Sequence, residues 1–356
     1  MENTNPIIDK LVSKSASWLD ATGSFSEIVL STRIRLARNL AGHNFVHRMK
    51  VKELKDALSE VKKVCEESKT LTGSTGSIFL DLKDLSPLEL EFLVERHLIG
   101  IDMARDGRSR GVVVGEGEKA SVMINEEDHL RLQSFSSGLQ PKKSYEIVNQ
   151  LDNELERELD FAVSEELGYL TACPTNTGTG IRCSILIHLP GLVLTKEIDK
   201  VLRGVTQVGF VVRGLYGEGT EVKGNFFQIS NQTTLGRSEE EIVESLEKIG
   251  RQVIQYEKDA REILLKSAIN QIEDKIWRAY GILKHAQVLT SDEFVNLSSA
   301  VRLGVGVGTI RSISIQELNR ILIHTQPAHL QKIYGEEMET EERDIRRAEY
   351  VRARIQ

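Results

Sequence analysis

Five arginines occupy positions that suit the binding of a phosphate chain. In the run STRIRLARNL, Arg33 and Arg35 flank Ile34, so both arginines point to the same face if the segment is extended. Three more arginines end or follow apolar or glycine-rich runs: Arg131, Arg182 and Arg213. A guanidinium offers a fork of donors that matches phosphate oxygens, and it stays protonated. We expect the five to form a triphosphate cradle, although surface strands and salt bridges also use arginine.

An acidic triplet follows the apolar run SVMI and consists of Glu126, Glu127 and Asp128. Three like charges at the end of a buried strand are unfavourable unless cations or a metal neutralise them. A functional site that gathers cations could supply that neutralisation. The alternative is a solvated acidic turn.

The segment CPTNTGTG places Cys173 among small residues, proline and glycine. Consecutive backbone N–H groups in such a loop can form a nest for an anion. The segment therefore indicates an anion-binding loop with a thiol beside it, and a simple turn is the alternative.

A second glycine-rich segment, RGLYGEGTEVKGN, contains four glycines and two acids, Glu218 and Glu221. Its composition predicts a mobile loop. Such a loop suits a lid that closes over a phosphoryl donor and keeps water away from it. A plain hairpin connection is the alternative.

The strand and helix patterns that must position these residues are typical of an α+β protein. Strand patterns dominate the middle of the chain, and from about Ser238 a 3.6-residue apolar period continues as helices almost to Gln356. We therefore expect a helical lead over residues 1–22, followed by a catalytic domain over 23–255 with a mainly antiparallel sheet flanked by helices. An all-helical domain over 256–356 completes the expected organisation.

Composition limits the classes of function. The 356 residues carry a net charge of −7, which argues against a nucleic-acid-binding protein with a diffuse basic surface. The three cysteines form no CxxC pair, no stretch is long and apolar enough to suggest a membrane span, and the N-terminus lacks the pattern of a secretory signal. We expect a cytoplasmic protein. No GxGxxG follows a predicted strand and GxxxxGK[ST] is absent, so a nucleotide would need another kind of site.

The order of five motifs resembles that of the phosphagen (guanidino) kinases, the family of creatine and arginine kinases. The motifs STRIR, NEEDHLR, CPTNTGTGIR, RGxxxE and ISNxxxxLG follow one another across roughly residues 25 to 255. The resemblance implies that the five arginines hold the phosphates of MgATP, with Mg²⁺ bound mainly by phosphate oxygens and waters rather than by protein ligands. It also implies nucleotide contacts from Ser31, Thr32, Ile34, His97, Cys183, Ser184, Ile185, Leu186, Gly214, Leu215, Tyr216, Gly217 and Glu218.

The same resemblance implies an acceptor and its contacts. Glu127 would bind and orient a guanidinium and take its proton, and Glu218 would be a second guanidinium-binding carboxylate, as in arginine kinases. Cys173 would be the reactive cysteine beside the substrate. Two carboxylates can align a planar cation through paired hydrogen bonds. Leu186 departs from the family, which often has histidine there, so the contacts to adenine and ribose stay open.

The C-terminal segment ERDIRRA, residues 342–348, contains Arg343 and Arg347 four residues apart, with Asp344 beside them. On a helix the two arginines face one side, where they could meet a phosphate while the aspartate meets an attached guanidinium. A solvated charged helix is the alternative. The segment is similar to the RDxxRA element of bacterial protein arginine kinases of the McsB type. That resemblance implies an allosteric phosphoarginine site, a homodimer, a zinc-binding activator adaptor and a Clp-type AAA+ unfoldase as partners.

These resemblances imply a kinase that phosphorylates accessible arginines of proteins and so marks them for Clp-type proteolysis in the bacterial stress response. A kinase of free arginine or another guanidino metabolite is one alternative, and a noncatalytic adaptor with the same fold is another. Glu218 favours an arginine-type acceptor over creatine. STRIR begins at residue 31, where the metabolite kinases would first have a helical domain, and this difference favours a protein acceptor. Retention of Glu127 and the five arginines disfavours the adaptor.

Overall fold

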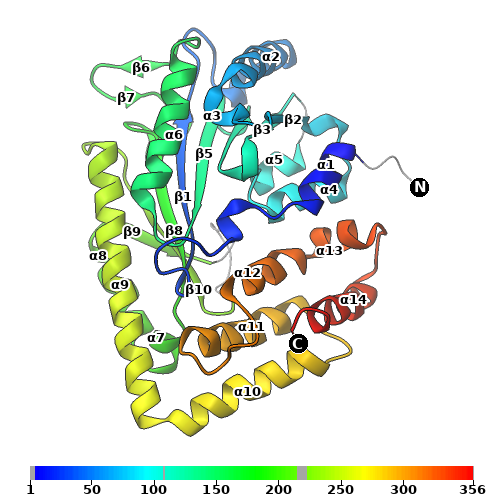
Figure 1. Ribbon diagram of the computed structural model, residues 1–356. Coiled ribbons are helices and arrows are strands. Elements are labelled where there is room, and N and C mark those ends of the chain that lie inside the picture. Colours follow the sequence, from blue (N-terminus) through cyan, green and yellow to red (C-terminus); the bar gives the residue numbers. More distant parts are fainter. Residues whose placement is uncertain (1–4, 107–108, 215–222, 356) are drawn as a thin grey trace.

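The computed structural model describes residues 5–106, 109–214 and 223–355. In this part of the chain an eight-stranded sheet forms the centre, and its neighbouring strands pair antiparallel throughout. The strand order is β2-β3-β4-β5-β1-β8-β10-β9, so β1 is an interior strand and β9 is an edge (Figure 1). The α+β class with an antiparallel sheet is thereby confirmed. The strands are β1 Val29–Arg38, β2 Ile78–Asp81, β3 Gly111–Val114, β4 Ala120–Ile124, β5 Leu130–Ser137, β8 Ile181–His188, β9 Phe210–Arg213 and β10 Phe226–Asn231, and a separate hairpin pairs β6 Val163–Ser164 with β7 Gly168–Tyr169.

Helices α6 (Pro141–Glu156) and α9 (Glu239–Ser267) lie along one face of the sheet (Figure 1). Ile34 of β1 packs there in one core with side chains of both helices, among them Leu151 and Val253. Because side chains alternate along a strand, the neighbours of Ile34 are directed to the other face. Four further helices contribute side chains to the same core: α2 Val51–Glu67, α3 Lys69–Thr72, α7 Pro190–Leu194 and α8 Ile198–Gln207.

A smaller core joins the beginning of the described chain to the edge of the sheet at β2 and β3. Helix α1 (Pro6–Ser13) contributes Ile8, which packs with Phe92 of α4 (Pro87–Glu95) and with Met103 of α5 (Ile101–Arg105). Ala328, far along the chain, belongs to the same core. Short 3₁₀ turns connect several elements: Ser17–Leu19, Val46–Arg48, Leu82–Asp84, Glu116–Glu118 and Pro174–Asn176.

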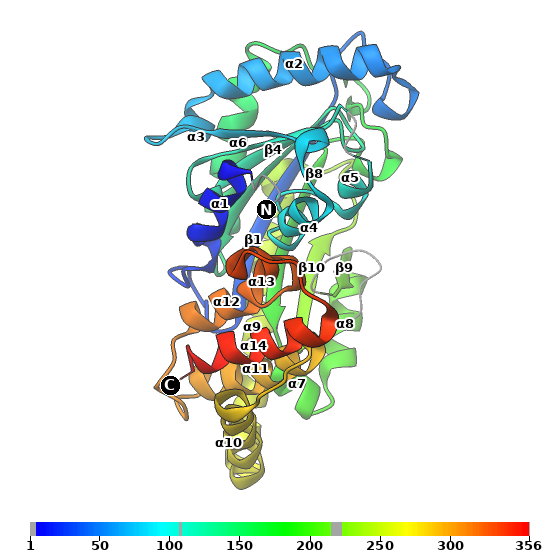
Figure 2. The ribbon, with the colours of Figure 1, turned by 90° about the vertical axis from the view of Figure 1, so that its right-hand side faces the viewer.

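The C-terminal helices form a layer at the end of the sheet opposite α2 (Figure 2). Their apolar core includes Trp18, Leu30 and Phe135 from the N-terminal two-thirds of the chain, so this layer and the sheet share buried surface. Helix α9 runs without a break through residues 255 and 256, where the domain boundary is expected, and the chain leaves that helix at Ala268. The helices are α10 Ile269–His285, α11 Ser291–Gly306, α12 Ile315–His324, α13 Pro327–Tyr334 and α14 Thr340–Arg352.

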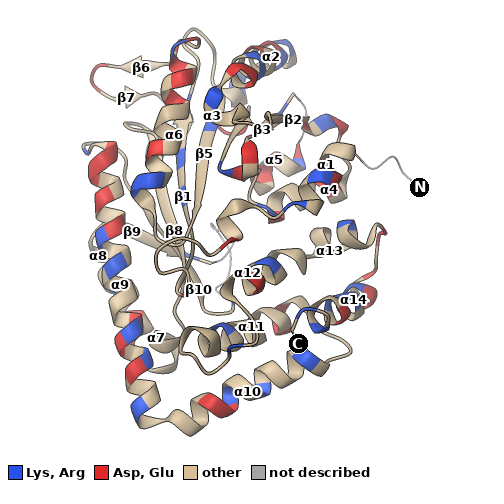
Figure 3. Ribbon diagram, viewed as in Figure 1, with Lys and Arg blue, Asp and Glu red and all other residues tan. Residues whose placement is uncertain are grey.

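Acidic and basic segments alternate along α9 (Figure 3). Several of these charges pair one helical turn apart, as in the ion pair of 2.7 Å between Arg251 and Glu247. Such pairs line the solvent side of the helix while its apolar side faces the sheet. Among the described residues, no helix combines the length and apolar character required to cross a membrane.

Candidate active site

A cavity of about 470 Å³ opens on the face of the sheet that α6 and α9 do not cover. All five arginines of the expected phosphate cradle line it, together with Glu127 and Cys173. Strands β1, β5, β8 and β9 each contribute at least one of these arginines. Residues separated by up to 180 positions in the chain thus meet in one place: Arg33, Arg35, Arg131, Arg182 and Arg213.

The register of the strands explains this convergence. Arg35 of β1 lies directly opposite Arg182 of β8, and Ala37 of β1 lies opposite Arg131 of β5. Directly opposed residues of an antiparallel pair project from the same face. Arg213 enters from the edge strand, opposite Gln228 of β10, which also lines the cavity.

Burial and neighbouring like charges disfavour the charged forms of Arg33 and Arg35. Burial, followed by repulsion from Arg131, lowers the pKa of Arg33 to about 9, although Glu126 partly offsets the shift. The pKa of Arg35 falls well below its ordinary value because of burial and then the charges of Arg33, Arg131 and Arg182. The Nε atom of Arg35 makes no hydrogen bond within the described part of the chain. A polyanion such as a triphosphate would relieve both the repulsion and the missing hydrogen bond.

The acidic triplet separates into three environments. Glu126 is largely buried and its Oε2 lies 2.7 Å from Nη1 of Arg131. Glu127 is 46% exposed, lines the cavity, and accepts a hydrogen bond of 3.0 Å from Nη2 of Arg131. Asp128 is fully buried. Arg131 therefore supplies the cation that the triplet requires, and Glu127 is the member of the triplet that faces the cavity.

The buried carboxylate of Asp128 holds the cysteine loop in place. Its Oδ1 accepts hydrogen bonds of 2.7 Å from the Asn39 side chain and 2.7 Å from the backbone N–H of Ala172, the residue before Cys173. In the sequence, Asp128 stands out only as a member of the charged triplet. Its positioning role depends on a contact between segments 44 residues apart.

We expect Asp128→Ala to reduce the free energy of unfolding by about 1 to 3 kcal/mol, since the Asn39 amide and the Ala172 N–H would lose their buried acceptor. Turnover should fall as well, because Cys173 and its loop would move. Burial raises the pKa of Asp128, so the fold disfavours its charge and a neutral acceptor should be tolerated. Asp128→Asn should therefore recover more than half of both losses in urea unfolding and rate measurements. Equal damage by both substitutions would contradict the positioning role.

The cysteine loop has an internal contact and is bonded to two other segments. The Sγ atom of Cys173 lies 3.0 Å from the Oγ1 of Thr175, within hydrogen-bonding distance. Thr234 donates its hydroxyl to the carbonyl oxygen of Thr175, and Arg38 donates to that of Thr179 at 2.9 Å. These bonds hold the thiol at the wall of the cavity.

A smaller cavity of about 100 Å³ is lined by Arg33 and Arg35 and includes His97 and Glu126. The His97 carbonyl oxygen accepts from the Gln133 amide at 3.0 Å, and the amide oxygen of Gln133 accepts from Nε of Arg33 at 3.0 Å. Burial, followed by Arg33 and then Arg35, lowers the pKa of His97 to about 3. The imidazole is therefore neutral at physiological pH, which suits a contact with a nucleoside rather than with phosphate.

The other residues expected at the nucleotide are placed differently. Ile34, Cys183 and Ile185 belong to the core with α6 and α9, on the opposite face from the cavity, so their side chains do not reach it. Leu186 is buried against the C-terminal helices, and Thr32 bonds the backbone at Gly138. Ser31, Ser184 and Gly214 are buried, whereas Leu215, Tyr216, Gly217 and Glu218 lie outside the described residues.

Two family models of known proteins match successive parts of the chain. Residues 59–260 match the family model described as ATP:guanido phosphotransferase, C-terminal catalytic domain. Residues 269–356 match the model described as Protein-arginine kinase McsB C-terminal domain. A protein-arginine kinase of Symbiobacterium thermophilum is 46% identical over 349 residues, which cover 98% of this chain and 99% of that protein.

The chain belongs to the protein-arginine kinase family. Another member, from Pelotomaculum thermopropionicum, is 46% identical and covers 94% of each chain. A protein-arginine kinase of Bacillus cereus (strain G9842) is 44% identical and covers 98% of each chain. The resemblance to guanidino kinases expected from the motifs is thereby confirmed.

Solved structures share the fold of about 70% of the chain. The duplicated taurocyamine kinase from Schistosoma mansoni, solved with transition state analog components, has a TM-score of 0.60 and 27% identity. The match covers 70% of this chain and 35% of that chain, so it spans about a third of the duplicated enzyme. Lombricine kinase has a TM-score of 0.56 and 26% identity, with coverage of 69% and 70%.

The RDIRRA segment of this family member lies on α14, close to the ends of neighbouring helices. Arg347 is 1% exposed, donates to the carbonyl oxygens of Thr325 and Leu289, and forms an ion pair with Asp344. Arg343 is partly exposed and donates to the carbonyl oxygen of Met338 at 2.7 Å. Arg347 thus has a structural role in the helical layer, while Arg343 and Asp344 retain exposed surface.

Proposed function

We propose that this chain transfers the γ-phosphoryl group of MgATP to the guanidinium of arginine residues in proteins. The observation that carries the proposal is the single cavity in which five arginines and one partly exposed glutamate, Glu127, face one another. Membership in the protein-arginine kinase family supports a protein as the acceptor.

The arginine cluster acts on the phosphates. Its guanidinium groups bind the triphosphate and neutralise the charge that spreads over the oxygens of the transferring phosphoryl group. Mg²⁺ adds positive charge at the same oxygens, and phosphate oxygens and waters can supply most of its ligands. The cavity fits this arrangement because Arg33 and Arg35 are crowded by like charges and Arg35 has an unused donor.

Glu127 acts on the acceptor. Its carboxylate accepts hydrogen bonds from the substrate guanidinium, orients one nitrogen toward the γ-phosphorus, and takes the proton that this nitrogen loses. A nitrogen–phosphorus bond forms while the bond from the γ-phosphorus to the bridging oxygen breaks, and ADP leaves with that electron pair. Cys173, on the wall of the same cavity, helps to position the guanidinium. We propose Glu218 as the second guanidinium-binding carboxylate.

The test is to incubate the chain with MgATP and either casein or free L-arginine, and to measure acid-labile, base-stable phosphate. We expect label on casein. Label on free arginine alone would identify a metabolite kinase instead. No label on either acceptor would overturn the proposed function.

We further propose that the chain works in the cytoplasm as a homodimer, with a zinc-binding activator adaptor and a Clp-type AAA+ unfoldase as partners. In this proposal, phosphoarginine marks proteins for degradation in the stress response. The proposal rests on the likeness of residues 269–356 to the McsB C-terminal domain. We also propose a division of the chain into a helical lead, a catalytic domain and a helical C-terminal domain.

We expect phosphoarginine to regulate the kinase through Arg343, Asp344 and Arg347. Asp344→Ala should leave basal turnover within about twofold but abolish the response to added free phosphoarginine, because the partly exposed carboxylate would contact its guanidinium group. Glu342→Ala on the same helix is the matched control. Rate measurements across a phosphoarginine titration check this expectation, and an intact response in Asp344→Ala would contradict the regulatory site.

A further inference from the structure

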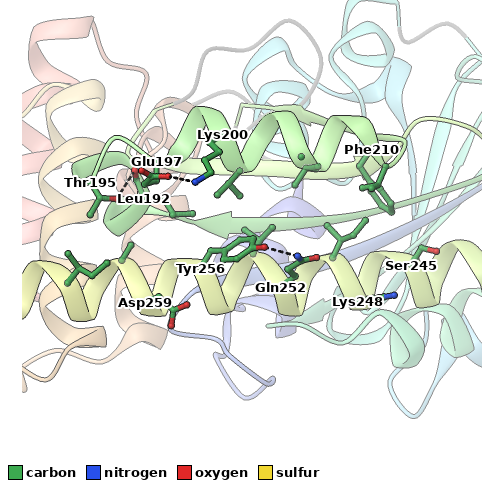
Figure 4. Close-up of a pocket in the computed structure, with 18 of the residues that line it drawn as sticks. Leu192, Thr195, Glu197, Lys200, Phe210, Ser245, Lys248, Gln252, Tyr256 and Asp259 are labelled. Atoms are coloured by element: carbon green, nitrogen blue, oxygen red, sulfur yellow. Dashed lines mark hydrogen bonds and ion pairs between the residues drawn. The ribbon is translucent and has the colours of Figure 1, made fainter.

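A groove of about 1100 Å³ lies between α8 and α9, outside the catalytic cavity. Figure 4 shows Phe210 near one end of it, while Glu197 and Asp259 mark the other end. Its apolar side chains are unusually exposed: Val208 is 58% exposed, Tyr256 43% and Ile263 58%. Exposed apolar side chains gathered along a groove are typical of an interaction surface.

We propose that this groove binds an unfolded segment of the protein substrate that flanks the target arginine. The inference rests on the proposed function and assigns to it a docking site for the polypeptide. The occupant is an extended segment with several large apolar side chains and a carboxylate.

The position of the groove beside the catalytic cavity, across the edge strand β9, supports this occupant. Phe210 of β9 lines the groove, whereas the next residue, Val211, lines the catalytic cavity. Gln232, also in the wall of the catalytic cavity, donates its backbone N–H to the carbonyl oxygen of Gly209 at 3.1 Å. Gly209 directly precedes Phe210 and follows Val208, which lies in the groove. Because consecutive strand residues face opposite sides, the groove and the cavity lie on opposite faces of the sheet, and the beginning of the edge strand β9 forms the junction between them.

This junction lies on the acceptor side of the cavity. The loop that carries Cys173 is bonded to the segment after β10, since Thr234 donates to the carbonyl oxygen of Thr175 at 3.1 Å. Thr175 and Gln232 both line the cavity. A polypeptide whose arginine reaches Glu127 can enter the groove by passing around the edge strand β9 at its beginning, and an extended chain advances about 3.3 Å per residue along this path.

The charges at the junction end complement a carboxylate. Arg237 and Lys248 line this end of the groove, and Lys248 is exposed and makes no ion pair within the described ranges. At the far end Glu197 is already paired with Lys200 at 3.3 Å. An acidic residue between the target arginine and the apolar anchors would therefore find a partner near the cavity.

The experiment measures the binding of fluorescently labelled casein by anisotropy, together with its phosphorylation. Val208→Asp and Ile263→Asp place a charge in the groove at exposed positions, so folding should be retained. We expect each to weaken casein binding and raise the KM for casein about tenfold, with MgATP affinity unchanged. Ile269→Asp is the matched control, because Ile269 is 46% exposed on α10 and lies outside the groove.

Unchanged casein affinity in both groove variants would overturn the inference while leaving the proposed function intact. Failure of the unmodified chain to label casein would instead overturn the proposed function. A second measurement replaces Tyr256 with the photoreactive residue p-benzoylphenylalanine in the otherwise unmodified chain. Crosslinking to casein supports the groove as the docking site. Crosslinking only to a second copy of the chain would assign the groove to self-association and overturn the inference.

Discussion

Glu127→Gln is expected to lower the rate of phosphoryl transfer to protein arginine by about 10²- to 10⁴-fold, the range for loss of a positioned acid–base group. Glutamine keeps the shape of the side chain but cannot take the proton from the guanidinium. MgATP should still bind, because the arginines of the cavity remain. Single-turnover rates and the binding of a fluorescent nucleotide measure the two effects separately.

The prediction applies to Glu127 and not to its two acidic neighbours because of where Glu127 lies. Of the three neighbouring acids, Glu126 is largely buried against Arg131 and Asp128 is fully buried, so Glu127 is the member available to a substrate. Glu262→Gln, at an exposed position of α9, is the matched control and should leave the rate unchanged. Cys173→Ser should lose less activity than Glu127→Gln, since the serine hydroxyl can take the place of the thiol at the wall of the cavity. Transfer at a near-normal rate in Glu127→Gln would remove its assigned role.

Arg35→Met is expected to have two opposite effects. Phosphoryl transfer should fall by about 10³-fold, because one of the donors that neutralise the transferring group is lost. The ligand-free protein should become more stable, since burial and the charges of Arg33, Arg131 and Arg182 all oppose the charge of Arg35. A gain of about 1 kcal/mol would raise Tm by about 1 °C in a chain of 356 residues.

Thermal unfolding with and without MgATP tests both effects in one series. In the unmodified chain a nucleotide at 100 times its Kd should add about 2.7 kcal/mol of stability. That gain should shrink in Arg35→Met although the ligand-free Tm rises. Arg105→Met is the matched control, because the Arg105 side chain is 75% exposed and lies away from the cavity. A lower ligand-free Tm in Arg35→Met would show that the cluster is not strained by like charge.

The sequence determined much of the strand arrangement. The alternation of Arg33, Ile34 and Arg35 follows the two-residue period of a strand, so the arginines and the buried isoleucine had to face opposite sides. The same period places Cys183 and Ile185 in the core, although the family resemblance had included them among the nucleotide contacts. The long helical pattern after Ser238 was equally clear, because it is a local property of the chain.

Only the tertiary structure decided which polar groups are buried and which partners they meet there. Three adjacent acids look equivalent in the sequence, yet packing makes Asp128 an acceptor for Ala172, pairs Glu126 with Arg131, and leaves Glu127 facing the cavity. In the same way, α14 buries Arg347 under the ends of other helices while Arg343 stays partly exposed. Strand and helix periods reflect neighbours two to four residues apart, whereas burial and the resulting electrostatics depend on segments that meet only when the chain has folded.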